Sequence, residues 1–241
     1  MLVHERLRHL KTIDLFRSFR EELKAFAKVA CCRRIQKGEV ISSPGDRADR
    51  IYFLAEGKVR IVRPGERGRR AILGFINPGE LFGEHAILVE GVMENRAEAI
   101  EKGVVCHITS RTFRRLLMRE PALTLRLAQI IIRRHQILEN RVAGLILKDV
   151  TARLAERLLN LFKEQGIPCR HGYETETAIT RQDLADLVGA ARPTISSALN
   201  ILKRRGLIHL VGRAICLIDR EQLQAVAASP SVIELTKGKS G

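Results

Sequence analysis

Residues 180–205 constrain the fold of this chain more than any other stretch. Thr180, followed three residues later by Asp183, resembles a capping box in which Asp replaces the usual Glu or Gln. An apolar stripe at helical spacing comes next, formed by Leu184, Leu187 and Val188. Gly189 suits a turn that needs a positive φ angle. The stretch therefore predicts a short helix, a tight turn and the start of a second helix.

The second helix has two distinct faces. Pro193 is compatible with its first turn, because amides there have no intrahelical partner. Its buried face consists of Ile195, Leu199 and Leu202. Its outer face carries Arg192, Thr194, Ser196, Ser197 and Lys203. The alternative is a helical hairpin buried in a core, and the residues that follow argue against it.

A β-hairpin is predicted directly after this pair of helices. Residues 207–211 and 214–218 are apolar, β-branched runs separated by Gly212 and Arg213. Two helices followed by such a hairpin form a winged helix-turn-helix, which places its second helix in the DNA major groove. Arg213 at the wing tip is expected to contact a phosphate.

Net charge supports a polyanionic partner without locating it. The 241 residues suit two domains and carry a formal charge of +15, with a pI of about 10.3. Lys and Arg number 14 against 10 Asp and Glu in residues 148–241, but 28 against 17 in residues 1–147. The motif, not bulk charge, must therefore identify the DNA-binding domain.

The apolar runs and the cysteines of the sequence indicate a cellular compartment and exclude some cofactors. There is no run of 18 apolar residues and no signal-peptide core, so we expect a cytoplasmic protein without membrane contact. Five cysteines at 31, 32, 106, 169 and 216 lack Cys-x-x-Cys spacing. We therefore expect reduced thiols packed as small apolar residues, with neither a structural zinc site nor a disulfide framework.

The first half of the chain predicts a β-roll. Short apolar strands are expected at residues 50–54, 58–62, 71–76 and 104–108. Glycines between them recur at roughly regular spacing, at positions 38, 45, 57, 68, 79 and 83, as in a sandwich or jelly roll.

Residues 121–147 predict a long helix with a seam for a second subunit. Apolar positions at alternating steps of three and four form a heptad pattern: Ala128, Ile131, His135, Leu138, Val142 and Leu145. Arg133, Arg134 and Arg141 keep this seam narrow, which favours a homodimer. The alternative is a helix packed on its own sheet.

The order of β-roll, long helix and winged helix-turn-helix resembles the Crp/Fnr family. Residues 79–84, 147–150 with 153–155, and 180–207 carry the likeness. It implies an α+β fold: a jelly-roll, cyclic-nucleotide-binding-like effector domain (1–120), a dimerisation helix (121–147) and a DNA-binding domain (148–241). It also implies a transcriptional regulator, not an enzyme, and no cupin-like His-x-His grouping argues otherwise.

The cAMP-binding pattern of the family is incomplete here. Gly83 and Glu84 match the start of its phosphate cassette, but Met93, Glu94 and Asn95 stand where an Arg-Ser pair is needed. Leu138 and Glu139 replace the Thr-Ser pair that meets adenine. We therefore expect a small effector other than cAMP, or none. The expected effector site comprises Gly83, Glu84, His85, Arg96, Ile131, His135 and Leu138.

A haem is the alternative cofactor. Phe82-Gly83-Glu84-His85 is similar to the haem-ligand segment of the carbon-monoxide sensor CooA, so His85 is a candidate haem ligand and His4 a stand-in for the second one. An iron-sulfur cluster is not expected, because Cys31 and Cys32 are adjacent. His135 is either a packing residue of the seam or a switch between subunits.

The resemblance also assigns the DNA contacts. Thr180, Arg181 and Gln182 match phosphate-binding positions, and Arg192 is expected to read guanine. Pro193 and Ser197 stand where the cAMP receptor protein has charged side chains that contact bases. We therefore do not expect this chain to share the operator specificity of that protein. A two-fold dimer implies an inverted-repeat operator in double-stranded DNA. Residues 168–176 are interpreted as an exposed loop for contact with RNA polymerase.

Overall fold

The computed structural model describes residues 3–89, 91–170, 172–175, 179–211 and 214–229. The chain packs as two compact units, residues 1–134 and 135–241, each described separately below. The boundary falls inside the long helix α4 (Pro121–Leu147), so α4 contributes to both units. The division at residues 120 and 147 stays a prediction.

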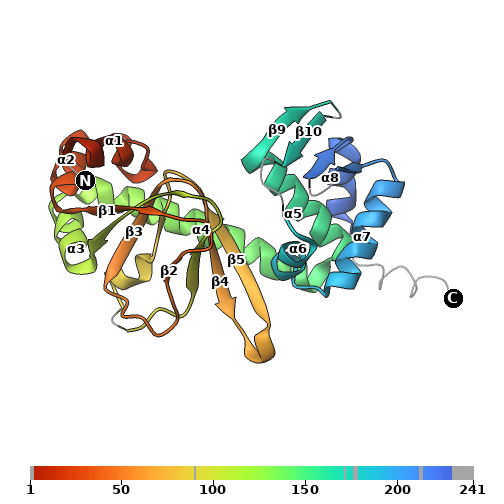
Figure 1. Ribbon diagram of the computed structural model, residues 1–241, viewed down its shortest axis with the longest axis horizontal. Helices are drawn as coiled ribbons and strands as arrows, with labels where there is room; N and C mark the ends of the chain where they lie inside the picture. Colours follow the sequence, from red (N-terminus) through yellow and green to blue (C-terminus); the bar gives the residue numbers. More distant parts are fainter. Residues whose placement is uncertain (1–2, 90, 171, 176–178, 212–213, 230–241) are drawn as a thin grey trace. The chain divides into compact units, whose positions relative to one another are not determined.

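Unit 1 is a β-roll built from two antiparallel sheets (Figure 1). In the described residues one sheet has the order β1-β8-β3-β6 and the other β2-β7-β4-β5. The strands are β1 (Cys31–Ile35), β2 (Val40–Ser42), β3 (Arg50–Glu56), β4 (Val59–Pro64), β5 (Arg70–Ile76), β6 (Leu81–Phe82), β7 (Arg96–Ala99) and β8 (Gly103–Thr109). Strands β3, β4, β5 and β8 confirm the four strands expected from the sequence.

Helices gather at one end of this roll (Figure 1). They are α1 (Val3–Leu10), α2 (Arg20–Val29) and α3 (Ser110–Arg119), together with the 3-10 turn η1 (Asp14–Phe16). Two further 3-10 turns are η2 (Glu66–Gly68), between β4 and β5, and η3 (Glu84–Ile87), after β6. A cluster of aromatic side chains joins them to the sheet, because Phe16, Phe26 and Phe113 all pack around Phe53. Leu123 and Leu127 of α4 complete the same core. Helices α1 and α2 were not predicted from the sequence.

One turn of the roll explains why a glycine is needed there. Gly57 links β3 to β4 with a φ of 83°, and a Cβ atom there would lie 2.5 Å from the carbonyl oxygen of Lys102. Any larger residue would therefore push the β3–β4 turn away from the segment before β8.

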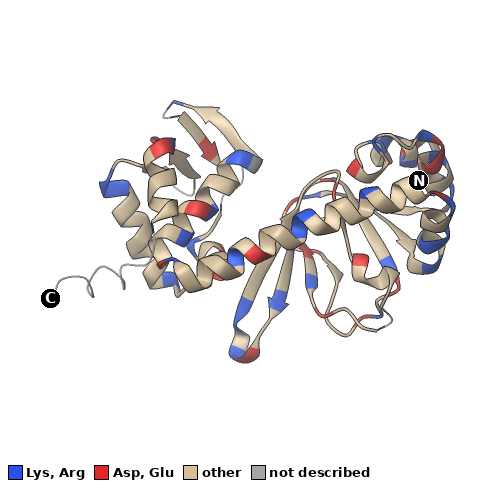
Figure 2. Ribbon diagram, turned by 180° about the vertical axis from the view of Figure 1, so that it is seen from behind, with Lys and Arg blue, Asp and Glu red and all other residues tan. Residues whose placement is uncertain are grey.

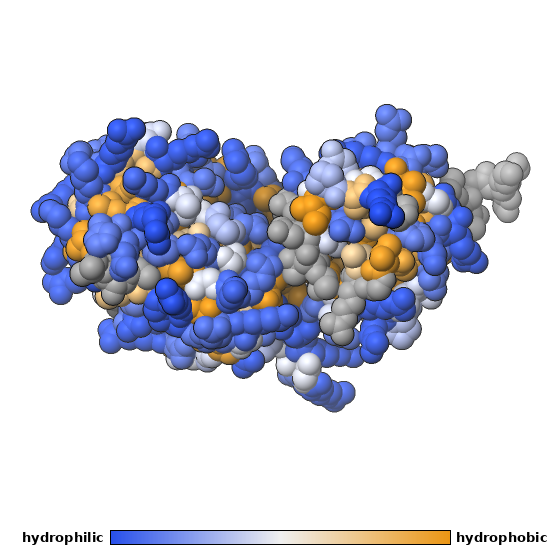
Figure 3. Space-filling model, turned by 45° about the horizontal axis from the view of Figure 1, so that its top comes forward, coloured by the Kyte–Doolittle hydropathy of each residue, from blue (hydrophilic) through white to orange (hydrophobic). Residues whose placement is uncertain are grey.

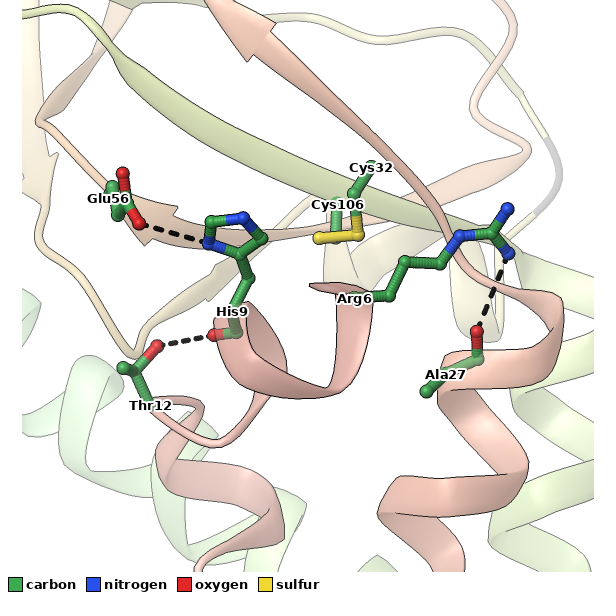
Figure 4. Close-up of a disulfide and its surroundings, with 7 residues drawn as sticks. All are labelled: Arg6, His9, Thr12, Ala27, Cys32, Glu56 and Cys106. Carbon is green, nitrogen blue, oxygen red and sulfur yellow. Dashed lines mark hydrogen bonds and ion pairs between the residues drawn. A yellow bond between two sulfur atoms is a disulfide. The ribbon is translucent and has the colours of Figure 1, made fainter. Parts of the chain in front are cut away.

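A disulfide joins the first and last strands of the roll, contrary to the expectation of reduced thiols (Figure 4). Cys32 of β1 and Cys106 of β8 are directly opposite in the antiparallel register. This cross-strand pairing brings together cysteines that are 74 residues apart, which spacing along the sequence did not reveal. Nearby, His9 of α1 lies 3.0 Å from a carboxylate oxygen of Glu56 (Figure 4).

Unit 2 contains a helix-turn-helix and a four-stranded sheet. Its helices beyond α4 are α5 (Val150–Gln165), α6 (Arg181–Val188), α7 (Arg192–Arg204) and α8 (Arg220–Ala228). Its sheet, ordered β11-β12-β10-β9 within the described part, contains β9 (Gly166–Cys169), β10 (Gly172–Thr175), β11 (Ile208–Val211) and β12 (Ala214–Leu217). The β11–β12 hairpin confirms the predicted wing strands.

The expected exposed loop at residues 168–176 is wrong for the part that the structure describes. Strand β9 pairs with β10, and β10 pairs in turn with β12 of the wing. The segment thus extends the wing sheet by two strands. In the sequence, Pro168, Arg170 and Gly172 lie close together, which is typical of a loop. The strand pairing is not evident from these residues because β10 forms hydrogen bonds with β12, which belongs to another hairpin.

Charge and polarity are spread over both units. Lys and Arg occur along the roll, the long helix and unit 2, without gathering in unit 2 (Figure 2). Hydrophilic residues cover most of the face drawn in Figure 3, with small apolar patches between them. Among the described residues, no helix is long and apolar enough to span a bilayer.

Candidate nucleic-acid interface and roll cavity

Helix α6 begins at the predicted capping box. The hydroxyl of Thr180 accepts a hydrogen bond from the Asp183 amide at 3.0 Å, and an Asp183 carboxylate oxygen accepts one from the Thr180 amide at 3.3 Å. Such a cap contributes about 1 kcal/mol to helix stability. Gly189 ends the helix in the left-handed conformation, with φ 70° and ψ 47°. The capping box and the left-handed Gly189 determine where the turn lies and therefore where α7 begins.

Helix α7 separates a buried face from an exposed one, as predicted. Ile195, Leu199 and Leu202 are at most 2% exposed. Arg192, Thr194, Ser197 and Lys203 are exposed, and Ser196 is half-buried. The hydroxyls of Ser196 and Ser197 donate to carbonyls one turn earlier, those of Arg192 and Pro193. The outer face is therefore polar and presents a cation at its first turn.

The predicted phosphate contacts and the predicted base reader meet at one concavity of about 430 Å³. Thr180, Arg181 and Gln182 line it from the start of α6, and Arg192 lines it from the start of α7. The guanidinium of Arg181 donates to the Ser196 hydroxyl at 3.4 Å, which links the two helices at this edge. Leu210, Ala214 and Ile215 of the wing strands form its apolar wall. A rim of this kind, cationic and rich in donors, suits a phosphate backbone.

Two polar residues of α7 extend this face beyond the residues expected from the sequence. Asn200 and Arg204 line a shallow groove together with Ser197 and Lys203. Asn200 and Arg204 follow Ser196 at steps of four residues, so helical periodicity could have identified them. Arg213, the expected phosphate contact of the wing tip, lies outside the described residues.

The roll of unit 1 encloses a second concavity, of about 410 Å³, whose lining is mostly apolar. Gly83, Glu84 and His85 of the predicted effector site line it, as does Ile131 of α4. Gly83 adopts φ 78° at the start of η3, which turns the chain into the cavity wall. The apolar part of the lining includes Ile61, Ile76, Phe82, Leu88, Val89 and Met93.

The guanidinium in this cavity is already paired. Arg134 of α4 donates to Glu84 Oε1 at 2.9 Å and to the Leu81 carbonyl oxygen at 2.6 Å. Among the described lining residues, Arg134 is the one Lys or Arg, and Glu84 is its counterion. The ion pair leaves the cavity close to neutral, with no cation reserved for an anionic ligand. From the sequence, Arg134 was assigned only to the border of the dimer seam, and its contact with Glu84 was not predicted.

The other expected effector residues lie elsewhere. Arg96 is exposed at the start of β7 and is not part of the cavity lining. Met93 is buried and lines the cavity, and Asn95 lines it as well. Glu94 and Asn95 bind the guanidinium of Arg63 at 2.7 and 2.6 Å. His135 and Leu138 lie further along α4 and are exposed. The predicted effector residues that line the cavity are thus Gly83, Glu84, His85 and Ile131.

The heptad seam of α4 is open to solvent in the single chain. Its large apolar members are Ile131, Leu138, Val142 and Leu145, which are 41%, 54%, 50% and 53% exposed. His135 on the same line is exposed, and Ala128 is half-buried. By contrast, Leu123 and Leu127 turn into the roll core. The helix therefore has one face packed on its own sheet and a separate apolar face without cover in the described chain.

A β-roll, a long helix and a winged helix-turn-helix in this order define a class of DNA-binding transcriptional regulators. Two family models match the chain: "Cyclic nucleotide-binding domain" over residues 32–120 and "Crp-like helix-turn-helix domain" over residues 152–226. A CRP-like cAMP-activated global transcriptional regulator of Mycobacterium tuberculosis is 30% identical over 187 residues, or 78% of this chain and 84% of that protein.

Solved structures agree. FixK2 from Bradyrhizobium japonicum matches with a TM-score of 0.72 at 25% identity, over 83% of this chain and 98% of that one. A CooA mutant from Carboxydothermus hydrogenoformans matches with a TM-score of 0.70 at 21% identity, over 83% and 89% of the two chains, which shows a shared fold. The chain belongs to the Crp/Fnr family and is a DNA-binding transcriptional regulator of that type.

Proposed function

We propose that this regulator acts in the cytoplasm as a homodimer that binds an inverted-repeat operator through α7. The observation that carries the proposal is the shared concavity at which Arg192 meets Thr180, Arg181 and Gln182. Donors at the start of α6 can hold phosphates, while Arg192 reaches a base edge from the first turn of the recognition helix. Contact with RNA polymerase remains a prediction.

The exposed seam of α4 supports the homodimer. Burying four large apolar side chains that are about half exposed favours association by roughly 1 kcal/mol each on transfer values. A second copy is the simplest partner, because a parallel heptad seam complements itself. A two-fold pair would present two α7 helices about one helical turn of DNA apart.

We further propose that the effector is a small, largely apolar molecule and not cAMP. The relative from Mycobacterium tuberculosis is described as cAMP-activated, and a cyclic phosphate needs an available cation. In the roll cavity of this chain the Arg134 guanidinium is held by Glu84, and Met93, Glu94 and Asn95 stand where the family pattern has its Arg-Ser pair. The mostly apolar lining suits burial of an apolar ligand.

Haem is a second candidate occupant, because His85 lies in the lining of this apolar cavity. His85 would hold the iron through an imidazole nitrogen, and the iron would supply a binding position for a diatomic gas. A Soret absorption band in the purified protein, lost in His85→Ala, would support this occupant. A protein that is colourless as purified and binds no added hemin would exclude haem as the occupant.

The proposal is tested by selecting bound duplexes from a random pool, with and without a cell extract that supplies the effector. We expect enrichment of an inverted repeat whose half-sites are separated by about one helical turn. Added cAMP should leave operator affinity unchanged, whereas the extract should change it. Enrichment of a single, asymmetric half-site would contradict the dimeric reading, and tighter binding with cAMP would contradict the effector assignment.

A further inference from the structure

Three potential metal ligands, none of which lines either concavity described above, meet on the wing sheet. They are Cys169 at the end of β9, Glu174 in β10 and Cys216 in β12. Within the described part of the chain, their sulfur and carboxylate oxygen atoms all lie within 4.8 Å of one another. Two thiols and a carboxylate therefore converge on one point from three strands.

The strand register explains the convergence. Glu174 is directly opposite Cys216 in the β10–β12 ladder, so both side chains leave the same face of the sheet. Cys169 is opposite Gly172 in the β9–β10 ladder, two residues before Glu174 and hence on that face as well. Gly172 has no side chain to separate Cys169 from the other two. His209 of β11 is directly opposite Cys216 in the β11–β12 ladder.

The electrostatics of this cluster favour a cation. Cys216 is 1% exposed, and its thiol donates to a Glu174 carboxylate oxygen at 3.8 Å. Burial raises the pKa of Cys216 to about 11, and the neighbouring Cys169 and Glu174 add to the rise. Ionising the thiols beside this carboxylate would accumulate negative charge that a metal ion would neutralise.

We propose that Cys169, Glu174 and Cys216 bind a soft divalent cation of the zinc type. Thiolates select such ions over magnesium and calcium, and two sulfurs with one carboxylate oxygen leave a fourth tetrahedral position for water. Binding displaces the thiol protons, so the affinity should rise with pH. The ion would fasten the β9–β10 hairpin to β12, the returning strand of the wing.

The absence of Cys-x-x-Cys spacing does not exclude this site. Cys169 and Cys216 are far apart in the sequence and meet through sheet pairing. A disulfide between them is the competing use of the same thiols, but it would leave the Glu174 carboxylate without a role. In the structure both cysteines are free, unlike Cys32 and Cys106.

The test titrates cobalt(II) into the reduced, metal-stripped full-length protein and follows the absorption spectrum. We expect a thiolate-to-cobalt charge-transfer band and visible bands of tetrahedral cobalt, saturating at a single equivalent and abolished by excess zinc. Cys169→Ser and Glu174→Gln change half-buried side chains and should lose these bands while the circular dichroism spectrum stays native.

Cys31→Ser is the matched control, because Cys31 is an exposed free thiol of unit 1. It should keep the full cobalt spectrum. The proposal is overturned if the wild-type protein gives no thiolate-cobalt band, or if Cys169→Ser and Cys216→Ser both bind as the wild type does. It is equally overturned if the reduced protein binds no metal and mild oxidation instead links Cys169 to Cys216.

Discussion

Arg192 occupies the exposed first turn of α7, where a recognition helix enters the major groove. Arg192→Ala should cost about 1–3 kcal/mol on the preferred operator and relax the base preference at one position in each half-site. The reason is that a guanidinium gives two hydrogen bonds to guanine that an Ala side chain cannot replace. Operator selection with the variant, followed by affinity measurements on single-base changes, provides the check.

Arg181→Ala is the matched comparison, because Arg181 lines the same concavity from the start of α6. A phosphate contact should weaken binding to all sequences alike and lower the salt dependence by roughly one counterion. If Arg192→Ala leaves the sequence preference unchanged, its assignment as base reader is wrong.

His107 makes the stability of the roll depend on pH. Burial lowers the pKa of His107 below its ordinary value of 6.5, and Arg50 and Arg33 lower it further. The unfolded chain therefore binds a proton at a higher pH than the folded chain. Above pH 6.5 the residue has no effect, and as the pH falls below that value the free energy of unfolding should decrease.

Tyrosine fluorescence can measure this effect, since the chain has two tyrosines and no tryptophan. In a Tyr173→Phe background the signal comes from Tyr52, whose ring lies 5.9 Å from that of His107. Urea midpoints should fall between about pH 7 and about pH 5, and His107→Gln should flatten the slope. Equal slopes in the two proteins would show that other groups cause the pH dependence.

At the scale of elements, the turn between α6 and α7 depends on a left-handed residue. Gly189→Ala should destabilise unit 2 by roughly 1–2 kcal/mol, because a side chain with a Cβ disfavours φ 70°. The loss should come from the backbone alone, since the new methyl group would be 3.4 Å from Leu145 Cδ2, an ordinary contact. Urea unfolding followed by Tyr173 fluorescence in a Tyr52→Phe background measures it.

Gly144→Ala serves as the control within the same unit. Gly144 lies inside α4, and a Cβ there would approach nothing closer than 3.8 Å. Helix propensity then predicts a gain of about 0.5–1 kcal/mol. A destabilisation of equal size in both variants would mean that packing, not the turn conformation, sets the cost at Gly189.

Local signals made α6, α7 and the wing strands predictable. The capping box at Thr180, the stop at Gly189 and the apolar spacing of Ile195, Leu199 and Leu202 all act within a few residues. Strand β10 was read as loop because its hydrogen-bond partners lie on another hairpin. The Cys32–Cys106 bond and the Arg134–Glu84 pair were missed for the same reason: long-range pairing brings each pair together.

At the scale of the whole molecule, the seam of α4 predicts the state of assembly. Leu138→Glu places a charge in the middle of the proposed dimer interface and should shift the protein to a monomer with operator affinity reduced at least about tenfold. Sedimentation velocity and operator binding measure the two effects. Leu125→Glu is the control, because Leu125 is 67% exposed on the same helix but off the seam.

A monomeric wild-type protein, or a Leu125→Glu variant as disrupted as Leu138→Glu, would contradict the assignment of the seam. The residues of the proposed seam follow from heptad spacing, which depends on the sequence alone. Whether two chains associate depends on both molecules, and sedimentation velocity measures that association directly.

The bond between Cys32 and Cys106 closes a covalent ring around most of the roll. Every cavity-lining residue from Ser42 to Ala97 belongs to that ring, whereas Ile131 and Arg134 reach the cavity from outside it. Cleavage by a thiol reductant would thus loosen the wall of the cavity that the strands and loops form and leave the helical wall as it was. We therefore expect the redox potential of the solution to determine how far this cavity can widen to admit a bound molecule.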